Sequence, residues 1–196
     1  MKYKNIKNIP EKIELDKRTN RAIEIFHKIS KLSKKFEWRV ALLSGFAIDA
    51  HFGYLTKNHR DVDIMMPKDQ ADLLGKHLEK MGHDVYEAEK FKGECLKVDQ
   101  ADPKKDTQAH CDIHYFWEEN KKVVIPLLGK KLIFSKSFNE MTTTKEFLGE
   151  KMRILKPKYL LEEKIGWCKQ IGLSQCKDKP EEYKADINKI NLLTNK

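Results

Sequence analysis

Residues 42–67 read LLSGFAIDAHFGYLTKNHRDVDIMMP and hold the pattern that decides the fold. A short apolar run stops at Ser44 and Gly45, a helix-like run follows, and Asp61 and Asp63 then flank Val62. Strand side chains alternate between two faces, so both aspartates point one way and Val62 points into the core. The pattern predicts a strand over 39–43, a helix over 46–54 that Gly53 ends, and a strand over 61–66.

The two aspartates on one strand face raise an electrostatic problem. Carboxylates this close repel each other unless a cation lies between them, and oxygen ligands suit Mg²⁺. Asp112, in the strand-like segment AHCDIHYF, also stands between apolar residues. We therefore predict that Asp61, Asp63 and Asp112 meet as metal ligands. Replacing Asp61 or Asp63 by asparagine should then leave the metal-free protein equally or more stable.

The Ser44–Gly45 turn supplies the other half of the predicted site. A small residue and a glycine between a strand and a helix let backbone N–H groups approach a phosphate closely. The chain then returns as the strand that carries the aspartates, so the turn and the carboxylates are expected at one end of the sheet. Asp49, inside the helix, is expected to organise the loop through hydrogen bonds.

The rest of the chain predicts a mixed α/β first part and a helical tail. Apolar residues at helical spacing predict a helix within 12–35 and another over 67–81, which Gly82 ends. Strands are expected at 83–87, 94–98, 109–117, 122–125, 132–134 and 152–155. The polar segment 101–108 should join two of them as neighbours. After Pro157, the runs YLLEEKIGWCKQ and EEYKADINKINLL predict two helices.

Composition narrows the classes of protein. Of the 196 residues 40% are hydrophobic, enough for a core, and the net charge of +9 favours anionic partners, although solubility explains that charge equally well. The four cysteines form no CxxC pair and no zinc-ligand spacing. The sequence has neither a signal-peptide pattern nor a membrane-spanning run. A cytoplasmic protein with reduced thiols and no membrane partner is expected.

The run from Gly45 to Ile64 resembles the signature of small antibiotic nucleotidyltransferases. These are the aminoglycoside 2''-nucleotidyltransferases and lincosamide nucleotidyltransferases of the DNA-polymerase-β-like superfamily. Their pattern is G-G-x-A-h-D, a short run to G-x-x-T, and then H-x-D-h-D-h. The matching positions are Gly45, Ala47, Asp49, Gly53, Thr56, His59, Asp61 and Asp63. The chain departs from the pattern at Ser44, where many members have glycine.

The resemblance implies an α/β (α+β) polymerase-β-like nucleotidyltransferase fold, in which helices flank a mixed β-sheet and a helical C-terminal segment follows. We place the nucleotidyltransferase domain at 1–148 and the helical segment at 149–196. The implied reaction moves a nucleoside monophosphate, AMP from ATP or its equivalent from another nucleoside triphosphate, onto a hydroxyl of a small molecule such as an aminoglycoside or lincosamide. Two Mg²⁺ ions are implied as cofactors.

The same resemblance implies roles for individual residues. The implied metal ligands and catalytic residues are Asp61, Asp63 and Asp112, and the implied nucleotide-binding residues are Ser44, Gly45 and His59. For Asp112 two roles stay open: a metal ligand, or the base that takes the proton of the acceptor hydroxyl. The preferred nucleotide, the acceptor and the oligomeric state also stay open.

Several alternatives stand beside this interpretation. A toxin-type member of the superfamily would modify RNA or protein, which suits the basic charge, and a non-catalytic module would only bind nucleotide. The row His110, Asp112 and His114 offers ligands for zinc, although a substrate or polar-face role for the histidines is simpler. Lys164 either reaches a phosphate or, more simply, lies on a solvated helix face.

A cationic acceptor such as an aminoglycoside meets a further difficulty. A protein with a net charge of +9 repels a polycation unless its acceptor cleft is locally acidic. The acidic residues that the sequence offers for such a cleft are Glu87, Glu89, Glu94, Glu118 and Glu119.

Overall fold

The computed structural model describes residues 13–87, 91–100, 110–170 and 180–194. The helices are α1 (Lys17–Phe36), α2 (Ser44–Phe52), α3 (Lys68–Lys80), α4 (Phe138–Met141), α5 (Pro157–Gln170) and α7 (Pro180–Thr194). The strands are β1 (Ala41–Leu42), β2 (Asp61–Pro67), β3 (His83–Tyr86), β4 (Cys95–Gln100), β5 (His110–Glu119), β6 (Lys122–Leu127), β7 (Lys130–Phe134), β8 (Thr142–Phe147) and β9 (Glu150–Leu155).

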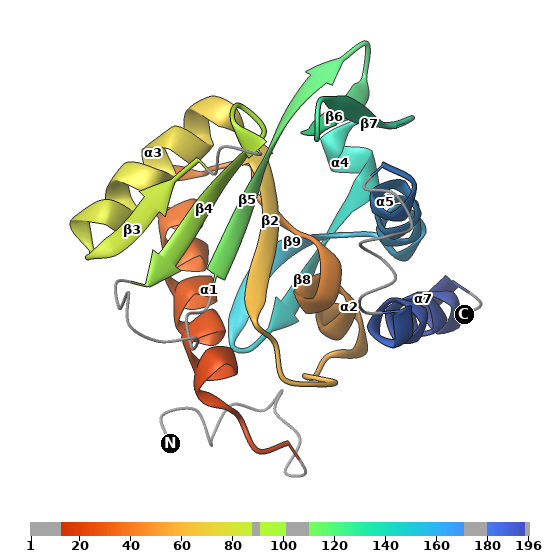
Figure 1. Ribbon diagram of the computed structural model, residues 1–196, viewed down its shortest axis with the longest axis horizontal. Coiled ribbons are helices and arrows are strands. Elements are labelled where there is room, and N and C mark those ends of the chain that lie inside the picture. Colours follow the sequence, from red (N-terminus) through yellow and green to blue (C-terminus); the bar gives the residue numbers. More distant parts are fainter. Residues whose placement is uncertain (1–12, 88–90, 101–109, 171–179, 195–196) are drawn as a thin grey trace.

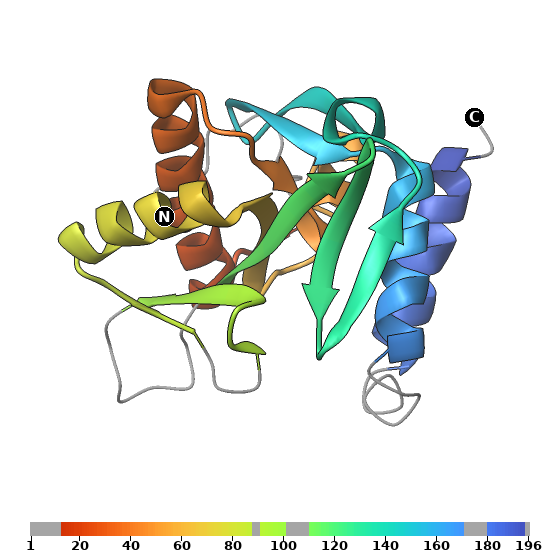
Figure 2. The same cartoon turned by 90° about the horizontal axis from the view of Figure 1, so that it is seen from above.

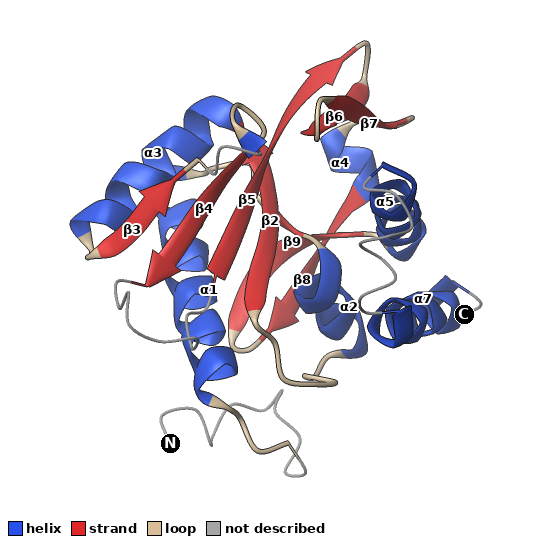
Figure 3. Ribbon diagram, viewed as in Figure 1, coloured by secondary structure: helices blue, strands red, loops and turns tan. Residues whose placement is uncertain are grey.

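These strands form one mixed sheet at the centre of the molecule. The order along the sheet is β3-β4-β5-β2-β1-β9-β8, and β6 and β7 continue from β5. Helices α1 and α3 lie on one side of the molecule, and α5 and α7 lie side by side on the other (Figure 1, Figure 2). Figure 3 shows the helical C-terminal end after the last strand. The predicted fold, a mixed sheet flanked by helices, is confirmed.

Strand β2 lies in the interior of the sheet and has the predicted alternation of faces. It pairs in parallel with β5 and antiparallel with β1. Val62 and Ile64 are fully buried in the core. Because successive side chains point to opposite faces, Asp61 and Asp63 stand on the other face of the same strand. The parallel register places Asp63 directly beside Asp112.

The ends of the first two helices follow local hydrogen bonding. The side chain of Asp16 accepts a hydrogen bond from the backbone N–H of Thr19 at 2.7 Å, so α1 begins at Lys17, five residues after the start of the predicted range. Helix α2 ends as predicted at Gly53, whose φ of 80° is the left-handed conformation that glycine adopts without strain.

The aromatic side chains of three elements pack together and fix the position of α2. The ring centroids of Phe26 in α1, Phe46 in α2 and Phe147 in β8 lie 5.9–6.1 Å apart. All three side chains are buried. Such aromatic pairs add about 0.5–1.5 kcal/mol beyond the area that they bury. The first turn of α2 is therefore attached to a rigid part of the core.

Among the strands that the structure describes, β8 is the one that the sequence interpretation missed. Its sequence, TTTKEF, carries three consecutive exposed residues, so it has no alternation of apolar and polar positions. This pattern is typical of a strand at the edge of a sheet, where β8 lies. Strand β9 pairs with both β8 and β1, so the sheet extends past residue 148. The division into domains at that residue stays a prediction.

Two further expectations concern the strand neighbours and the thiols. Strands β4 and β5 pair as predicted, while the segment 101–108 between them lies outside the described residues. Cys95, Cys111 and Cys168 form no disulfide, and Cys176 lies outside the described residues. Within the described ranges, every helix is too short or too polar to cross a membrane.

Glu150, at the start of β9, joins the sheet to α1. Its carboxylate accepts hydrogen bonds from Ser30 at 2.9 Å and from Lys34, and His27 lies 3.4 Å away. Burial alone would raise the pKa of Glu150, but these partners lower it below its ordinary value of 4.5. The ionised carboxylate therefore stabilises the folded protein above pH 4.5, and this stabilisation is lost as the pH falls through the lowered pKa.

We predict that Glu150→Gln lowers the free energy of unfolding at pH 7 by about 1 kcal/mol. The difference from wild type should shrink as the pH falls below 4.5, which urea denaturation at a series of pH values measures. Glu146→Gln, at an exposed position of β8, is the matched control and should change stability little at any pH. A difference that stays constant down to acid pH would contradict the assignment.

Candidate active site

One cavity of about 330 Å³ contains all the residues that the sequence predicts for the site. Its lining includes Ser44, Gly45, His59, Asp61, Asp63 and Asp112. Helix α2, the loop before β2, the strands β2 and β5, and the helices α5 and α7 all contribute to its walls. The fold therefore brings together residues from both halves of the chain.

The three aspartates meet where β2 and β5 run side by side. Asp63 and Asp112 are register partners, and neighbouring strands lie about 4.8 Å apart. Asp61 opens to solvent on one side. Burial of the rest of its side chain, followed by the charges of Asp63 and Asp112, raises the pKa of Asp61 to about 7. The negative charge of the three aspartates is therefore only partly balanced by the cationic side chains around them.

Asp63 differs from Asp61 because it has a cationic partner. Nε2 of His114 lies 3.7 Å from Oδ1 of Asp63. Burial alone would raise the pKa of Asp63, but the contact with His114 lowers it below its ordinary value. Burial would conversely lower the pKa of His114, but Cys95 and Asp63 raise it well above 6.5. The position beside Asp63 therefore favours the protonated form of His114.

The two oxygens of Asp112 have different surroundings. Oδ2 accepts a hydrogen bond from Nζ of Lys97 at 2.7 Å. Oδ1 is buried and has no hydrogen-bond partner among the described residues. A buried carboxylate oxygen without a partner is costly, so it indicates a position where a ligand or metal binds. Of the predicted zinc row, Asp112 and His114 are described, and the side chain of His110 lies outside the described part of the chain.

The turn at Ser44 and Gly45 forms the N-terminal end of α2. No side chain caps this end, so its first N–H groups are available to an anion. The space at position 45 suits only glycine, because a Cβ atom there would lie 2.9 Å from the ring of His59. Ser44 has a φ of 49°, a left-handed conformation that favours glycine. The glycine that the family pattern has at this position would adopt the conformation without strain.

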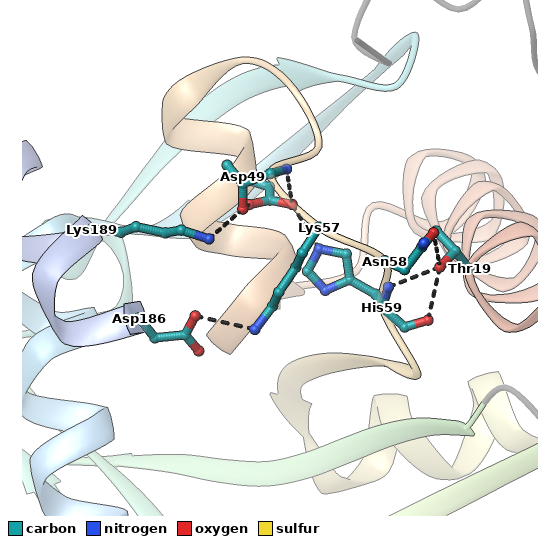
Figure 4. Close-up of polar contacts among 8 residues, drawn as sticks. Thr19, Asp49, Lys57, Asn58, His59, Asp186 and Lys189 are labelled. Carbon is teal, nitrogen blue, oxygen red and sulfur yellow. Dashed lines mark hydrogen bonds and ion pairs between the residues drawn. The ribbon is translucent and has the colours of Figure 1, made fainter. Parts of the chain in front are cut away.

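Asp49 and His59 hold the loop that leads into β2 (Figure 4). The Asp49 carboxylate lies 2.6 Å from Nε2 of His59 and accepts hydrogen bonds from the backbone N–H and the hydroxyl of Thr56. The backbone N–H of His59 donates to Thr19 at 2.8 Å. Asp49 thus organises the loop, as predicted. His59 orients the loop too, and a contact between His59 and nucleotide stays a prediction.

Helix α5 contributes three residues to the cavity. Lys164 is only 8% exposed, so the solvated helix face expected for it is wrong. Glu163 is buried and accepts a hydrogen bond from the Ser44 hydroxyl at 3.1 Å, while its Oε2 has no partner among the described residues. Burial raises the pKa of Glu163. Trp167 completes this wall, with its ring centroid 5.5 Å from that of His114.

Sequence reasoning missed Glu163 and Trp167, although a signal was present. Leu160, Glu163, Lys164 and Trp167 follow the spacing i, i+3, i+4, i+7 of one helix face. Leu160 and Trp167 mark this face of the helix as buried, and charged residues such as Glu163 and Lys164 are unusual on a buried face. They indicate a polar site beneath the helix.

Helix α7 completes the cavity with Asp186. Its carboxylate lies 3.2 Å from Nζ of Lys57 and 3.4 Å from Nζ of Lys164 (Figure 4 shows the first pair). Lys164 also lies over the ring of Tyr183, 5.2 Å from its centroid. The pKa of Lys164 is raised, because Glu163 and Asp186 outweigh the effect of its burial. No local pattern in the sequence predicts these contacts between distant segments.

The cavity is acidic although the protein is basic. Its lining has six carboxylates and three lysine or arginine side chains: Asp61, Asp63, Asp112, Glu163, Glu182 and Asp186 against Lys57, Arg60 and Lys164. Four of the five acidic residues that the sequence suggested do not line this cavity: Glu87, Glu94, Glu118 and Glu119. Glu87 accepts a hydrogen bond from Tyr115, Glu94 from the backbone of Leu128 and Gly129, and Glu118 from Arg39. Glu89 lies outside the described residues.

Comparison with solved structures identifies the fold. The lincosamide antibiotic adenylyltransferase LnuA, solved with lincomycin bound, matches with a TM-score of 0.60 and 17% identity over 94% of this chain and 98% of its own. ANT(2'')-Ia, solved with adenylyl-2''-tobramycin, matches with a TM-score of 0.62 and 15% identity over 86% of each chain. A putative nucleotidyltransferase from Thermotoga maritima matches with a TM-score of 0.50 and 13% identity over 82% of this chain and 92% of its own.

The sequence comparison supports the class of enzyme and the resemblance to one family. The chain is a nucleotidyltransferase, an enzyme of the class that its fold and its carboxylate-bearing strand pair indicate. Residues 25–117 match the model of the aminoglycoside-2''-adenylyltransferase family, which confirms the resemblance of the 45–64 segment to antibiotic nucleotidyltransferases. A search of curated protein sequences finds no significant match.

We predict that Asp61→Asn and Asp63→Asn change the stability of the metal-free protein in different directions. Asp61→Asn removes a charge that burial and two neighbouring carboxylates disfavour, so the melting temperature at pH 7.5 in EDTA should hold or rise. Asp63→Asn leaves the buried His114 cation without its charged partner, so the melting temperature should fall. This replaces the expectation from the sequence that both changes are neutral or stabilising.

Scanning calorimetry of both variants in the presence of a chelator measures this difference. Asp69→Asn, at an exposed position in the first turn of α3, is the control for a loss of negative charge outside the cavity. Equal rises in both site variants would show that His114 does not depend on Asp63.

Proposed function

We propose that the protein transfers AMP from ATP to a hydroxyl group of a small molecule in a Mg²⁺-dependent reaction. The observation that carries the proposal is the shared cavity: the register pair of Asp63 and Asp112, with Asp61 beside them, lies in one cavity with the uncapped N-terminus of α2. A nucleoside triphosphate needs both an anion site and a means to neutralise its charge. The N–H groups at the start of α2 would form the anion site. The carboxylates would bind a metal ion, and that ion would neutralise the charge of the triphosphate.

The triphosphate is proposed to bind between α2 and α5. The N–H groups at Ser44 and Gly45 would donate to its phosphate oxygens, and the field of the helix terminus favours a negative charge there. Lys164 and Lys57 provide two ammonium groups, both held by Asp186. A triphosphate would offer each lysine a stronger anionic partner than that single carboxylate.

The aspartates fit a hard divalent cation. Their ligand atoms are oxygens only, Oδ1 of Asp112 has no partner among the described residues, and the pKa of Asp61 is raised to about 7 by burial and the neighbouring carboxylates. Asp61 and Asp63 would hold Mg²⁺, two ions in the full site, and Asp112 would be the third carboxylate beside them. When bound, Mg²⁺ neutralises charge on the phosphates and on the leaving group.

Asp112 is proposed to act as the base. Its free Oδ1 would accept the proton of the acceptor hydroxyl while Lys97 holds Oδ2. The acceptor oxygen then forms a bond to the α-phosphorus, and the bond from the α-phosphorus to the oxygen bridging to the β-phosphorus breaks. Pyrophosphate leaves with the electron pair of that bond. The chain contributes positioning and charge balance on both sides of the reacting phosphorus.

The acceptor is proposed to be a small cationic molecule of the aminoglycoside or lincosamide type. The cavity volume of about 330 Å³ is at the lower end of the range for small-molecule sites, and its acidic lining attracts an amine despite the net charge of +9. Proteins of this fold include LnuA, solved with lincomycin, and ANT(2'')-Ia, solved with adenylyl-2''-tobramycin. We place the reaction in the cytoplasm. RNA or protein as acceptor is the alternative function, which the basic net charge of the chain would suit.

Incubation of the purified protein with Mg²⁺-ATP and a panel of aminoglycosides, lincosamides and tRNA tests the proposal. We expect mass spectrometry to find an AMP adduct on a member of the antibiotic panel, and none after Asp61→Asn. Asp69→Asn is the surface control that should retain transfer. An adduct on tRNA alone would favour the toxin-type function, and nucleotide binding without any adduct in a broad panel would contradict the proposed acceptor class.

A second prediction separates the roles of Asp112. If Asp112 is the base, Asp112→Asn should lower turnover by about 10²–10⁴-fold and leave the affinity for Mg²⁺-ATP nearly unchanged. Calorimetric titration of Mg²⁺-ATP into the variant measures the affinity, and Asp61→Asn serves as the comparison that weakens it. A large loss of affinity in Asp112→Asn would assign Asp112 as a metal ligand, and unimpaired turnover would remove it from both roles.

A further inference from the structure

We propose that Cys95, Asp112 and His114 form a second metal site, selective for thiophilic divalent cations such as Zn²⁺. One ligand atom from each residue lies within 4.8 Å of the other two. Thiolate, carboxylate and imidazole are the ligand types of protein zinc sites, whereas Mg²⁺ takes oxygen ligands. Asp61 and Asp63 therefore suit a hard ion such as Mg²⁺, whereas Cys95, Asp112 and His114 suit a thiophilic ion such as Zn²⁺.

The pairing of β4 with β5 fixes the three ligands in place. Cys95 stands directly opposite His114 in the antiparallel register. Asp112 lies two residues before His114 on β5, so it projects from the same face of the sheet. Cys95 and His114 are both buried, at 2% and 4% exposure. Ligands on paired strands of a sheet interior need little ordering when an ion binds.

The free oxygen of Asp112 offers a ligand atom that no described residue occupies, while coordination by His114 would release a proton from its ring and replace the contact with Asp63. Lys97 occupies Oδ2, and Oδ1 has no partner among the described residues, so an ion bound at Oδ1 leaves the Lys97 ion pair intact. Zinc binds sulfur at about 2.3 Å and nitrogen at about 2.0 Å. The three ligand atoms lie within 4.8 Å of one another, so they would need to move closer together when an ion binds. The fourth tetrahedral position is left for water.

Occupation of this site should inhibit the enzyme. This step rests on the proposed function, in which Oδ1 of Asp112 accepts the proton of the acceptor hydroxyl. A zinc ion bound to that oxygen removes its capacity to accept a proton. Because Cys95 and His114 supply ligands that Mg²⁺ does not use, excess Mg²⁺-ATP should not relieve the inhibition.

Titration of Co²⁺ into the metal-free, full-length protein tests the site without any need for activity. Co²⁺ replaces Zn²⁺ in such sites, and a cobalt–thiolate bond gives charge-transfer absorption in the near ultraviolet. We expect one equivalent to saturate this band in wild type, in the presence of excess Mg²⁺. Cys168→Ser, which changes the more exposed thiol of α5, is the matched control and should keep the band. Cys95→Ser should lose it.

The absence of the band in wild type, or its persistence in Cys95→Ser, would overturn the proposed site. Far-ultraviolet circular dichroism verifies that each variant is folded, and Cys95→Ala replaces the serine variant if the hydroxyl is not tolerated. If neither folds, the wild-type titration decides alone.

Zinc inhibition of AMP transfer is the second measurement. The Zn²⁺ concentration for half inhibition, relative to each variant's own uninhibited rate, should rise at least about 10-fold in Cys95→Ser. An equal concentration in both proteins would overturn the inhibitory role. The two proposals can fail separately. If wild type shows the cobalt–thiolate band but zinc does not slow AMP transfer, the metal site is supported and the role of Asp112 as base is contradicted.

Discussion

The repulsion among three carboxylates at one corner of the sheet is the constraint to which the rest of the cavity responds. The β2–β5 pairing leaves Asp61, Asp63 and Asp112 no freedom to move apart, because their backbones are register partners or near neighbours. The surrounding elements supply cations in compensation: Lys97 from β4, His114 from β5 and Lys164 from α5. Each has its own carboxylate contact, and Asp61 keeps a pKa of about 7 nonetheless. The compensation is therefore incomplete, and this is the physical basis of our proposal that a divalent ion binds beside the aspartates.

The part of the fold that the sequence predicted is the part governed by local rules. The i, i+2 spacing of Asp61 and Asp63, the apolar residues between them, and Gly53 at the end of α2 follow from strand alternation and helix capping. Strand β8 obeys no such rule. It is an edge strand with a polar, exposed middle, so its position depends on pairing with β9 rather than on its own composition.

The candidate site divides in the same way. Its β2 and α2 residues stand within one short segment with a recognisable pattern, and Asp112 could be added because it repeats the context of an aspartate between apolar strand residues. The contacts of Asp186 with Lys57 and Lys164 join segments more than 20 residues apart in the chain, so neither spacing nor composition predicts them. Glu163 lies between these cases: the helix periodicity marks its face as buried, but only the tertiary structure identifies Ser44 as its partner.

The left-handed backbone of Ser44 links the first turn of α2 to the C-terminal helices in thermodynamic terms. A non-glycine residue in this conformation costs about 1–2 kcal/mol, and the hydrogen bond from the Ser44 hydroxyl to the buried Glu163 offsets part of that cost. A chain with glycine at this position would form the turn without help from α5. In this chain, the turn and α5 belong to one cooperative unit, so a local opening that lifts α5 away also releases the N-terminal end of α2.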